Sequence, residues 1–188
     1  MAINSTTSGP LRMVGVYTTS GTFIPPAGTT RCFVSILGAS GGQGGQRRYR
    51  QAGAGGSGVL VSGWVQVTPG HSHVVTIGAG GVAGAYSNVA QNNGTAGGQS
   101  SFDYTLIANG GAGSLGANGN AQSNAAAGSG TGETTLPTLN PGATTLVRVS
   151  DLVTQTTSAQ PGGYVETGGR YTPAANGNGI AGKVYIFI

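Results

Sequence analysis

Charged side chains are scarce in this chain. Asp, Glu, Lys and Arg make up 6% of its 188 residues, against about a quarter in ordinary soluble proteins. Eight Lys or Arg and four Asp or Glu leave a net charge of +4. A nucleic-acid-binding face usually carries a denser positive charge, so we expect no nucleic-acid partner. Solubility must come largely from Asn, Gln, Ser and Thr.

Cysteine and long apolar runs are scarce as well. Cys32 is the only cysteine, which excludes an intrachain disulfide, and its apolar neighbours predict a small buried side chain. No apolar run approaches about 18 residues. The first residues, MAINSTTSGPLRM, lack a basic stretch followed by an apolar one. We therefore expect no membrane insertion, and synthesis in the cytoplasm of the producing cell without a signal peptide.

Glycine, in contrast, is abundant, with 38 positions. It costs up to about 1 kcal/mol per residue in a helix interior, and Ser, Thr and Asn, which are also frequent, favour caps and turns. The sequence therefore predicts an all-β fold with a sandwich-like framework. Strand signals occur at residues 13–19, 21–26, 31–37, 58–70, 73–78, 100–110, 144–153 and 183–188.

Turn residues and apolar patterns predict how some of these strands pair. Ser20-Gly21 and Pro69-Gly70 predict hairpins, one joining the first two strands and one joining residues 58–70 to 73–78. Residues 31–37 are apolar on both faces and should be covered on both sides. The last strand, KVYIFI, should be inserted into a sheet.

Four glycine segments separate the strands, at residues 38–58, 78–98, 110–132 and 162–182. Within them glycine recurs at every third position, as in Gly38-Gly41-Gly44 and Gly110-Gly113-Gly116-Gly119. Three residues per turn is the period of the left-handed extended helix adopted by polyglycine II, whereas broken triplets and little proline exclude collagen. We predict ordered segments, lying side by side and joined by backbone hydrogen bonds. Residues that interrupt the glycines would form long loops at the edge of this layer.

Several short stretches match catalytic or phosphate-binding motifs in sequence but not in context. GASGG around Ser40, GAGGSG and GNGIAGK resemble a nucleophile elbow and phosphate-binding loops, but none opens a helix as these sites require. His71 and His73 should share one face of a strand, without a third metal ligand nearby in sequence. The four carboxylates show no spacing that selects a catalytic pair. We therefore predict no enzyme activity, no metal site and no cofactor.

Two polar stretches within the glycine segments are candidate binding loops. The first holds Arg47, Arg48, Tyr49 and Arg50, which gather three of the eight cations within four residues. Guanidinium groups around an aromatic ring suit a ligand with phosphate, carboxylate or sugar rings. The second holds Tyr86, Asn88, Asn92 and Asn93, a composition typical of adaptable binding loops. The alternative is that the arginines only keep a nearly uncharged protein soluble.

The order of several motifs resembles one known family. YTTSGTFIPPAGTTRCFVSILGASGGQGG, GVLVSGWVQVTPGHSHVVTIGAGG, GTAGGQSSFD, further glycine tracts and GKVYIFI follow one another. This order is similar to the glycine-rich domain of bacteriophage and prophage tail-fibre and receptor-binding proteins. The resemblance covers residues 17–188, which we expect to form one domain after an attachment arm at residues 1–16. Residues 133–160 depart from it as a glycine-poor insertion.

The resemblance implies an adhesin at the tail or fibre tip of a virion. Its loops would bind a bacterial surface glycan or an outer-membrane protein, and other virion proteins would hold it in place. Homotrimers are common in such proteins, although some members cap a trimeric fibre as one copy. Two alternatives remain: a capsid decoration or connector protein without receptor contact and, less favoured because carboxylates are few, a surface-glycan hydrolase.

Overall fold

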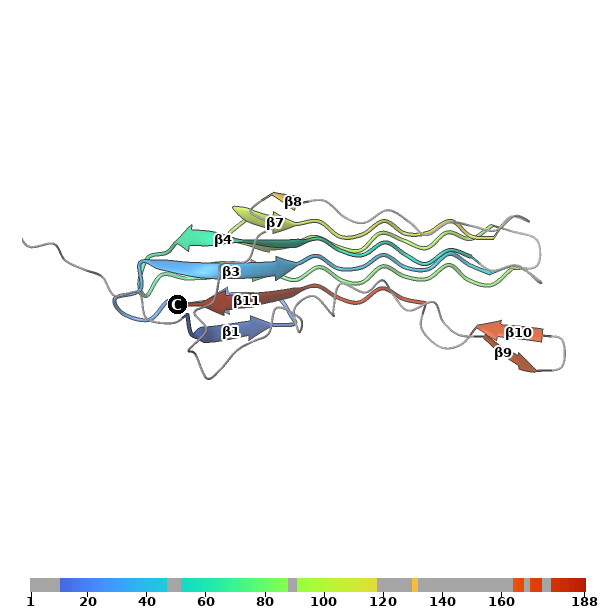
Figure 1. Ribbon diagram of the computed structural model, residues 1–188, viewed down its shortest axis with the longest axis horizontal. Coiled ribbons are helices and arrows are strands. Elements are labelled where there is room, and N and C mark those ends of the chain that lie inside the picture. The colour runs from blue at the N-terminus through green and yellow to red at the C-terminus, as the bar shows by residue number, and fades with distance from the viewer. Residues whose placement is uncertain are drawn as a thin grey trace, which may run out of the picture.

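The computed structural model shows an elongated all-β molecule, with most of its strands at one end and glycine segments running to the other (Figure 1). It describes residues 11–46, 52–87, 91–117, 130–131, 164–167, 170–173 and 177–188. None of these residues forms a helix that could cross a membrane. The described strands are β1 (Met13–Tyr17), β2 (Gly21–Phe23), β3 (Arg31–Leu37), β4 (Leu60–Gln66), β5 (His73–Thr76), β6 (Ser100–Phe102), β7 (Leu106–Ala108), β8 (Gly130–Thr131), β9 (Tyr164–Thr167), β10 (Arg170–Pro173) and β11 (Lys183–Phe187).

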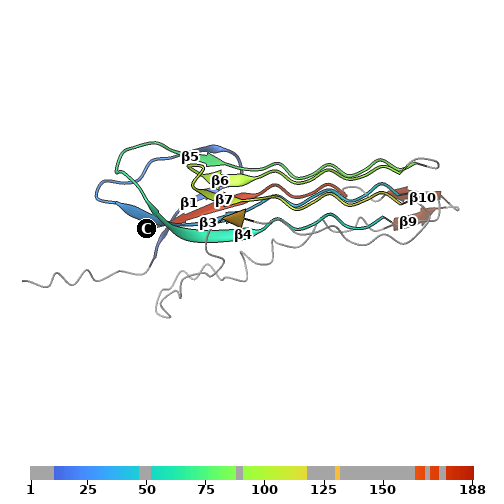
Figure 2. The ribbon, with the colours of Figure 1, turned by 90° about the horizontal axis from the view of Figure 1, so that it is seen from above.

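Two antiparallel sheets form a sandwich, as the sequence predicts. One sheet has the order β1-β11-β3-β4 and the other has the order β2-β5-β6-β7-β8. Figure 2 shows strands of both sheets continuing into the glycine segments. β9 and β10 pair only with each other among the described strands.

The sandwich core follows from alternation along β3. Cys32, Val34 and Ile36 are fully buried and point between the sheets, where Val75 and Phe102 face them from the second sheet. Phe33 and Leu37, on the other face of β3, are also buried. Both faces of β3 are therefore buried, as the sequence predicts, and on the outer face the rings of Trp64 and Phe187 pack against Phe33.

The two predicted hairpins are wrong. β1 pairs with β11 and β2 with β5, so the chain crosses from one sheet to the other at Ser20-Gly21. It crosses again between β4 and β5, because β4 pairs with β3 and β5 with β2 and β6. The turn at Pro69-Gly70 does exist, since the His71 N–H donates to the Thr68 carbonyl and Gly70 has a φ of 74°. Each of these strands buries one apolar face, and burial in the sandwich replaces the local pairing.

β11 lies between β1 and β3, which confirms that the last strand is inserted into a sheet. Its register with β3 pairs Lys183 with Leu37 and Phe187 with Phe33. β6 and β7 form a true hairpin, closed by a hydrogen bond from the Thr105 N–H to the Phe102 carbonyl. Asp103 and Tyr104 occupy this turn with φ of 47° and 56°, the positive values that a type I′ turn requires.

Glycine segments continue the strands and pack side by side, as predicted. We call this region the glycine layer and define it by residues 38–46, 52–58, 78–87, 91–99, 109–117 and 177–182. Residues 38–46 are buried throughout and lie at its centre. Each backbone N–H from Gly38 to Gly45 donates to a carbonyl of another segment, at 2.6–3.2 Å.

These hydrogen bonds repeat every three residues. The N–H groups of Gly38, Gly41 and Gly44 donate to Val59, Gly56 and Gly53, while those of Ala39, Gly42 and Gly45 donate to Gly98, Thr95 and Asn92. Ser40 and Gln43 donate to Ile180 and Gly177. The carbonyls of residues 39, 42 and 45 accept from residues 111, 114 and 117, and those of residues 40, 43 and 46 accept from residues 81, 84 and 87. The central segment therefore contacts five others, with the three-residue period of the extended helix.

The close approach of these backbones requires glycine. A Cβ built on Gly41 would lie 2.1 Å from the Ala112 carbonyl oxygen, and one on Gly44 would lie 2.0 Å from that of Leu115. A Cβ on Gly38 would meet the Asn109 backbone in the same way. The predicted triplet Gly38-Gly41-Gly44 therefore lines the contact with residues 109–117.

Some predicted segments differ from the structure or lie outside the described residues. The predicted glycine segment 162–182 contains the antiparallel pair β9–β10, and among its described residues 177–182 join the layer. The described residues do not include the predicted strand 144–153, the insertion 133–160 or residues 1–10 of the predicted arm. The domain boundaries stay predictions.

Candidate functional site

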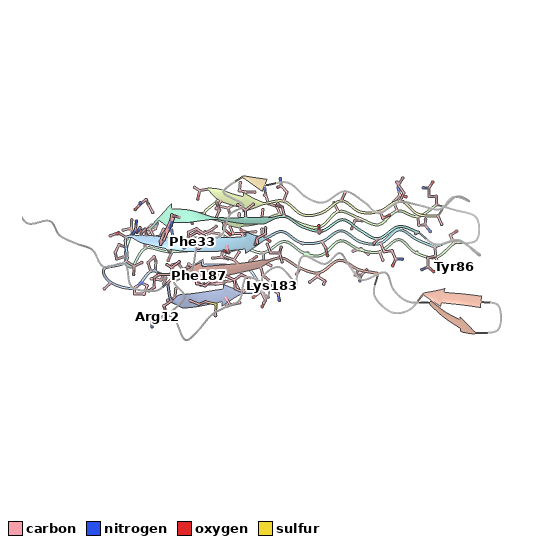
Figure 3. The ribbon with its side chains drawn as sticks, in the orientation of Figure 1. Arg12, Phe33, Tyr86, Lys183 and Phe187 are labelled. Atoms are coloured by element: carbon pink, nitrogen blue, oxygen red, sulfur yellow. The ribbon has the colours of Figure 1, made fainter. Side chains whose placement is uncertain are left out.

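The end of the glycine layer farthest from the sandwich is the candidate site, and we call it the tip. Residues 38–46, 78–87 and 109–117 leave β3, β5 and β7 and run towards it, whereas 52–58, 91–99 and 177–182 return to β4, β6 and β11 (Figure 1). Tyr86 marks the tip in Figure 3, far from Phe33 and Phe187 in the sandwich. Loops that are distant in sequence therefore begin and end at one place.

Backbone hydrogen bonds hold the tip segments in register. The Gly45 N–H donates to the Asn92 carbonyl at 2.6 Å, and the Ala117 N–H donates to the Gly45 carbonyl at 2.9 Å. Ser87 donates in the same way to Gln46 at 3.0 Å. The outgoing and returning segments are thus joined up to the last described residues before the loops.

The predicted site residues Asn92 and Asn93 lie at the tip, where their side chains hydrogen-bond to the backbone of neighbouring segments. The Asn92 side-chain amide donates to the Ala85 carbonyl at 2.9 Å, and Asn93 Oδ1 accepts from the Gly116 N–H at 3.0 Å. Tyr86 is 39% exposed at the same end. The structure thus brings together three of the predicted residues; their role in binding a ligand stays a prediction.

The remaining predicted site residues lie outside the described residues. They are Arg47, Arg48, Tyr49, Arg50 and Asn88. The residues flanking them do lie at the tip, Gln46 and Ala52 on one side and Ser87 and Gln91 on the other. Both predicted loops therefore begin and end at described residues of the tip.

Gln46 is a tip residue whose burial the sequence analysis missed. Its side chain is buried, and its Oε1 atom has no hydrogen-bond partner among the residues that the structure describes. A Gln next to three arginines gives no sequence signal of burial, because it resembles an ordinary loop residue. None of the described side chains at the tip is charged.

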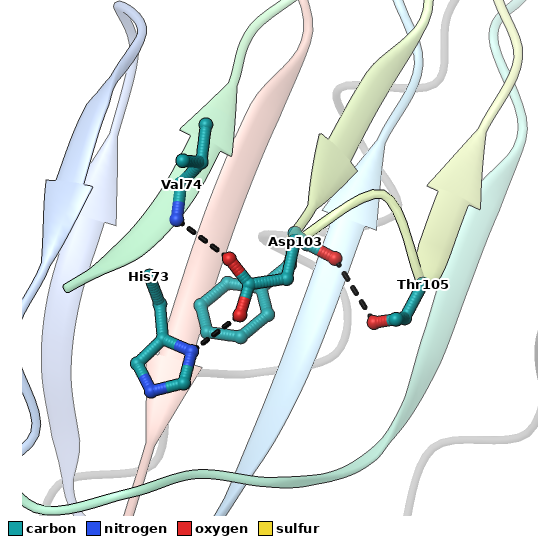
Figure 4. A network of polar contacts seen from close by, with 5 residues as sticks. His73, Val74, Asp103 and Thr105 are labelled. Carbon is teal, nitrogen blue, oxygen red and sulfur yellow. Dashed lines mark hydrogen bonds and ion pairs between the residues drawn. The ribbon is translucent and has the colours of Figure 1, made fainter. Parts of the chain in front are cut away.

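A second polar cluster, in the sandwich, was considered as a metal site. His73 Nδ1 hydrogen-bonds to Asp103 Oδ2, and Asp103 Oδ1 accepts from the Val74 N–H at 2.7 Å (Figure 4). The His71 and His73 rings are 5.5 Å apart, and His73 stacks on Phe102. Within the described part of the chain no group of three or more His, Cys, Asp or Glu could hold a metal ion. The contacts instead fix the β6–β7 turn against β5.

Cys32 and Ser40 also carry reactive groups, and both are buried. Burial, with a smaller effect from the Asp103 carboxylate, raises the pKa of the Cys32 thiol to about 12. Ser40 Oγ, at the centre of GASGG, accepts a hydrogen bond from the Ile180 N–H at 2.7 Å and thereby joins two segments of the glycine layer. Its observed contact is structural.

Comparison with known proteins agrees with this architecture. No curated protein matches the chain. The family model described as glycine-rich domain matches residues 18–186, which include the whole glycine layer and the sandwich strands except β1 and the last residue of β11. The chain therefore belongs to the glycine-rich domain family.

Proposed function

We propose that the chain is a non-enzymatic virion protein of a phage tail or tail-fibre tip, whose tip loops bind a bacterial surface glycan or an outer-membrane protein. One observation carries this proposal: the segments leaving β3, β5 and β7 all run to the same end of the molecule. A protein with this shape holds the described ends of its polar loops far from its hydrophobic core.

Rigidity of the glycine layer supports a presenting role. Glycine loses more backbone freedom on ordering than any other residue. Hydrogen bonds from every N–H of the central segment, Gly38 to Gly45, offset this cost within the fold. The loop ends are thus held in place before a ligand arrives, which lowers the entropy lost on binding.

Composition at the tip supports a polar ligand. Three arginines of the chain lie between Gln46 and Ala52, and Tyr86 lies exposed nearby on a neighbouring segment. Guanidinium forks recognise carboxylate and phosphate groups, and an exposed tyrosine ring can contact a sugar or an aromatic side chain. Both chemistries are present on bacterial surfaces.

Virion adsorption tests the proposal. We expect virions carrying Arg47→Ser, Arg48→Ser and Arg50→Ser together to adsorb to host cells at least about tenfold more slowly, because charge-assisted contacts to the receptor are lost. Thr68→Ala, at an exposed turn of the sandwich, is the matched control and should leave adsorption unchanged. Equal adsorption by both variants would remove the arginines from the receptor site.

Imaging of whole virions separates the proposal from its structural rival. A tail or fibre tip location, with the glycine layer pointing outward, is the expected result. A position on the head shell or at an internal joint would instead favour a decoration or connector protein without receptor contact.

A further inference from the structure

The outer face of the sheet β1-β11-β3-β4, which points away from the sandwich core, carries an unbroken apolar row. The strand registers pair Met13 with Phe187, Phe187 with Phe33, and Phe33 with Trp64, so one residue from each strand contributes. Trp64 is 49% exposed and Met13 41% exposed, whereas the two phenylalanines between them are buried. Val16, one row nearer the glycine layer, is also 49% exposed.

Aromatic contacts fix the orientation of the exposed tryptophan. Phe33 packs edge-on against Trp64, with ring centroids 5.5 Å apart, and Phe187 packs against Phe33 at 6.4 Å. The Arg31 guanidinium lies over the Trp64 ring, 4.7 Å from its centroid. A rigid tryptophan stacked with an arginine is typical of the residues that dominate protein–protein binding energy.

The charge on this face has one sign among the described side chains. Arg31 stands next to the apolar row, and Lys183 lies on the same face towards the glycine layer, since it pairs with Leu37. The only described Asp or Glu side chain, Asp103, belongs to the other sheet and is bonded to His73 and Val74. Two copies meeting through this face would place cations against cations, which disfavours a second copy as the occupant.

We propose that the outer face is a docking surface for a protein segment that combines apolar side chains with carboxylates. Its apolar side chains would cover Met13, Val16 and Trp64, and its carboxylates would bond to Arg31 and Lys183. Phe33 and Phe187, in the middle of the apolar row, lie far from Tyr86 at the tip (Figure 3). The partner would therefore hold the protein at its sandwich end and leave the tip free. This surface does not depend on the tip binding any receptor.

Trp64 reports on the state of this face because it is the only tryptophan in the chain. We expect acrylamide to quench Trp64 emission readily in the full-length free protein, at all protein concentrations. Emission that resists quenching would show that the chain's own residues already cover the face. Quenching that falls as protein concentration rises would show that a second copy covers it. Either result would overturn the proposal.

A charged probe then tests the chemistry of the partner. The probe is a synthetic peptide of alternating Val and Glu, and its control is the same peptide with Lys in place of Glu. We expect saturable binding of the acidic peptide only, with a blue shift of Trp64 emission that salt weakens. Equal binding of both peptides, or binding of neither, would overturn the proposal.

Two arginine variants locate the binding. Arg31→Gln should weaken binding of the acidic peptide about tenfold, as expected for the loss of one charge-assisted hydrogen bond. Arg12→Gln is the matched control: Arg12 lies at the same end of the sheet but pairs with Ile188, so its side chain leaves on the core side. Equal effects of the two variants would mean that the peptide responds to net charge alone, and the surface would be rejected.

Discussion

The sandwich and the glycine layer are built from one chain but are held together differently. In the sandwich, large side chains such as Phe102 and Ile36 are fully buried, and the backbone is bonded in ordinary antiparallel ladders. In the glycine layer, the central residues 38–46 are just as buried but are mostly glycine, with small or polar side chains between. Backbone groups there bond in several directions around the segment.

The difference shows two ways to order a polypeptide. Apolar burial stabilises the sandwich, at about 25 cal/mol per Å² of apolar surface. In the glycine layer there is little such surface, so stability must come from satisfied N–H and carbonyl groups and from close backbone packing. The stability of the sandwich should therefore be sensitive to the loss of side-chain atoms, and the stability of the glycine layer to their addition.

Removing a side chain from the sandwich should have the largest effect. Phe102 is fully buried and lies between the rings of Phe23 and His73. We expect Phe102→Ala to lower the free energy of unfolding by about 3–5 kcal/mol, because it removes apolar contacts and leaves a cavity. Urea unfolding measures this change. A loss below about 1 kcal/mol would contradict the assignment of the core.

Adding one methyl group to the glycine layer should have the next largest effect. In Gly41→Ala the new Cβ would meet the Ala112 carbonyl oxygen at 2.1 Å, so the backbones must move apart. We expect a loss of about 3 kcal/mol, at the upper end for overpacking. Gly63→Ala in β4 is the matched control, because its Cβ would meet only Leu106 Cδ1 at 3.5 Å.

Gly63→Ala should change stability by less than about 1 kcal/mol, since the contact is ordinary and alanine loses less backbone entropy than glycine. Replacing glycine by alanine should therefore lower stability much more in the glycine layer than in the sandwich. Similar losses for both variants, measured by urea unfolding, would show that the glycine layer is no more tightly packed than the sheet.

Alkaline pH should also lower stability, and it should act through the sandwich. The Cys32 thiol has an ordinary pKa of 9.0, raised to about 12 by burial. Between these values the unfolded chain releases the thiol proton and the folded chain keeps it, so stability falls as the pH rises from about 9 to about 12. Burial also raises the pKa of Tyr17 and Tyr185, which contribute with the same sign.

Cys32→Val isolates the contribution of the thiol, because both tyrosines remain. Unfolding followed from about pH 8 to about pH 11, a range that includes the ordinary thiol pKa, should show a shallower decline in stability for the variant. Native Cys32 should also react with a thiol reagent only after unfolding. Equal slopes for the two proteins would show that the thiol titrates in the folded state as it does in the unfolded one.

Sequence patterns predicted the three-residue repeat of the glycine layer better than the pairing of the strands. The triplet Gly38-Gly41-Gly44 indicated a close-packed helix of period three, because only glycine allows such contact on one side. The turn at Pro69-Gly70 indicated a reversal, but a turn residue does not determine which sheet receives the next strand. Both β4 and β5 have one apolar face, and this pattern suits a hairpin as well as a sandwich.

The candidate site was predictable in place but not in detail. Polar interruptions of the glycine segments indicated loops, and the structure brings Tyr86, Asn92 and Asn93 to one end. Nothing in the sequence showed that the amides of Asn92 and Asn93 bond to neighbouring backbone. Such contacts join segments distant along the chain, and local composition carries no information about them.

The central position of residues 38–46 has a consequence for biosynthesis. Its neighbours come from residues as late as Ile180, whose carbonyl accepts from the Ser40 N–H. During translation, residues 38–46 therefore cannot form all of their backbone hydrogen bonds until almost the whole chain has been synthesised. Long-range closure of this kind slows folding and leaves nascent backbone exposed to association with other chains. We expect ribosome-bound fragments that stop before residue 177 to be sensitive to proteases and dependent on chaperones.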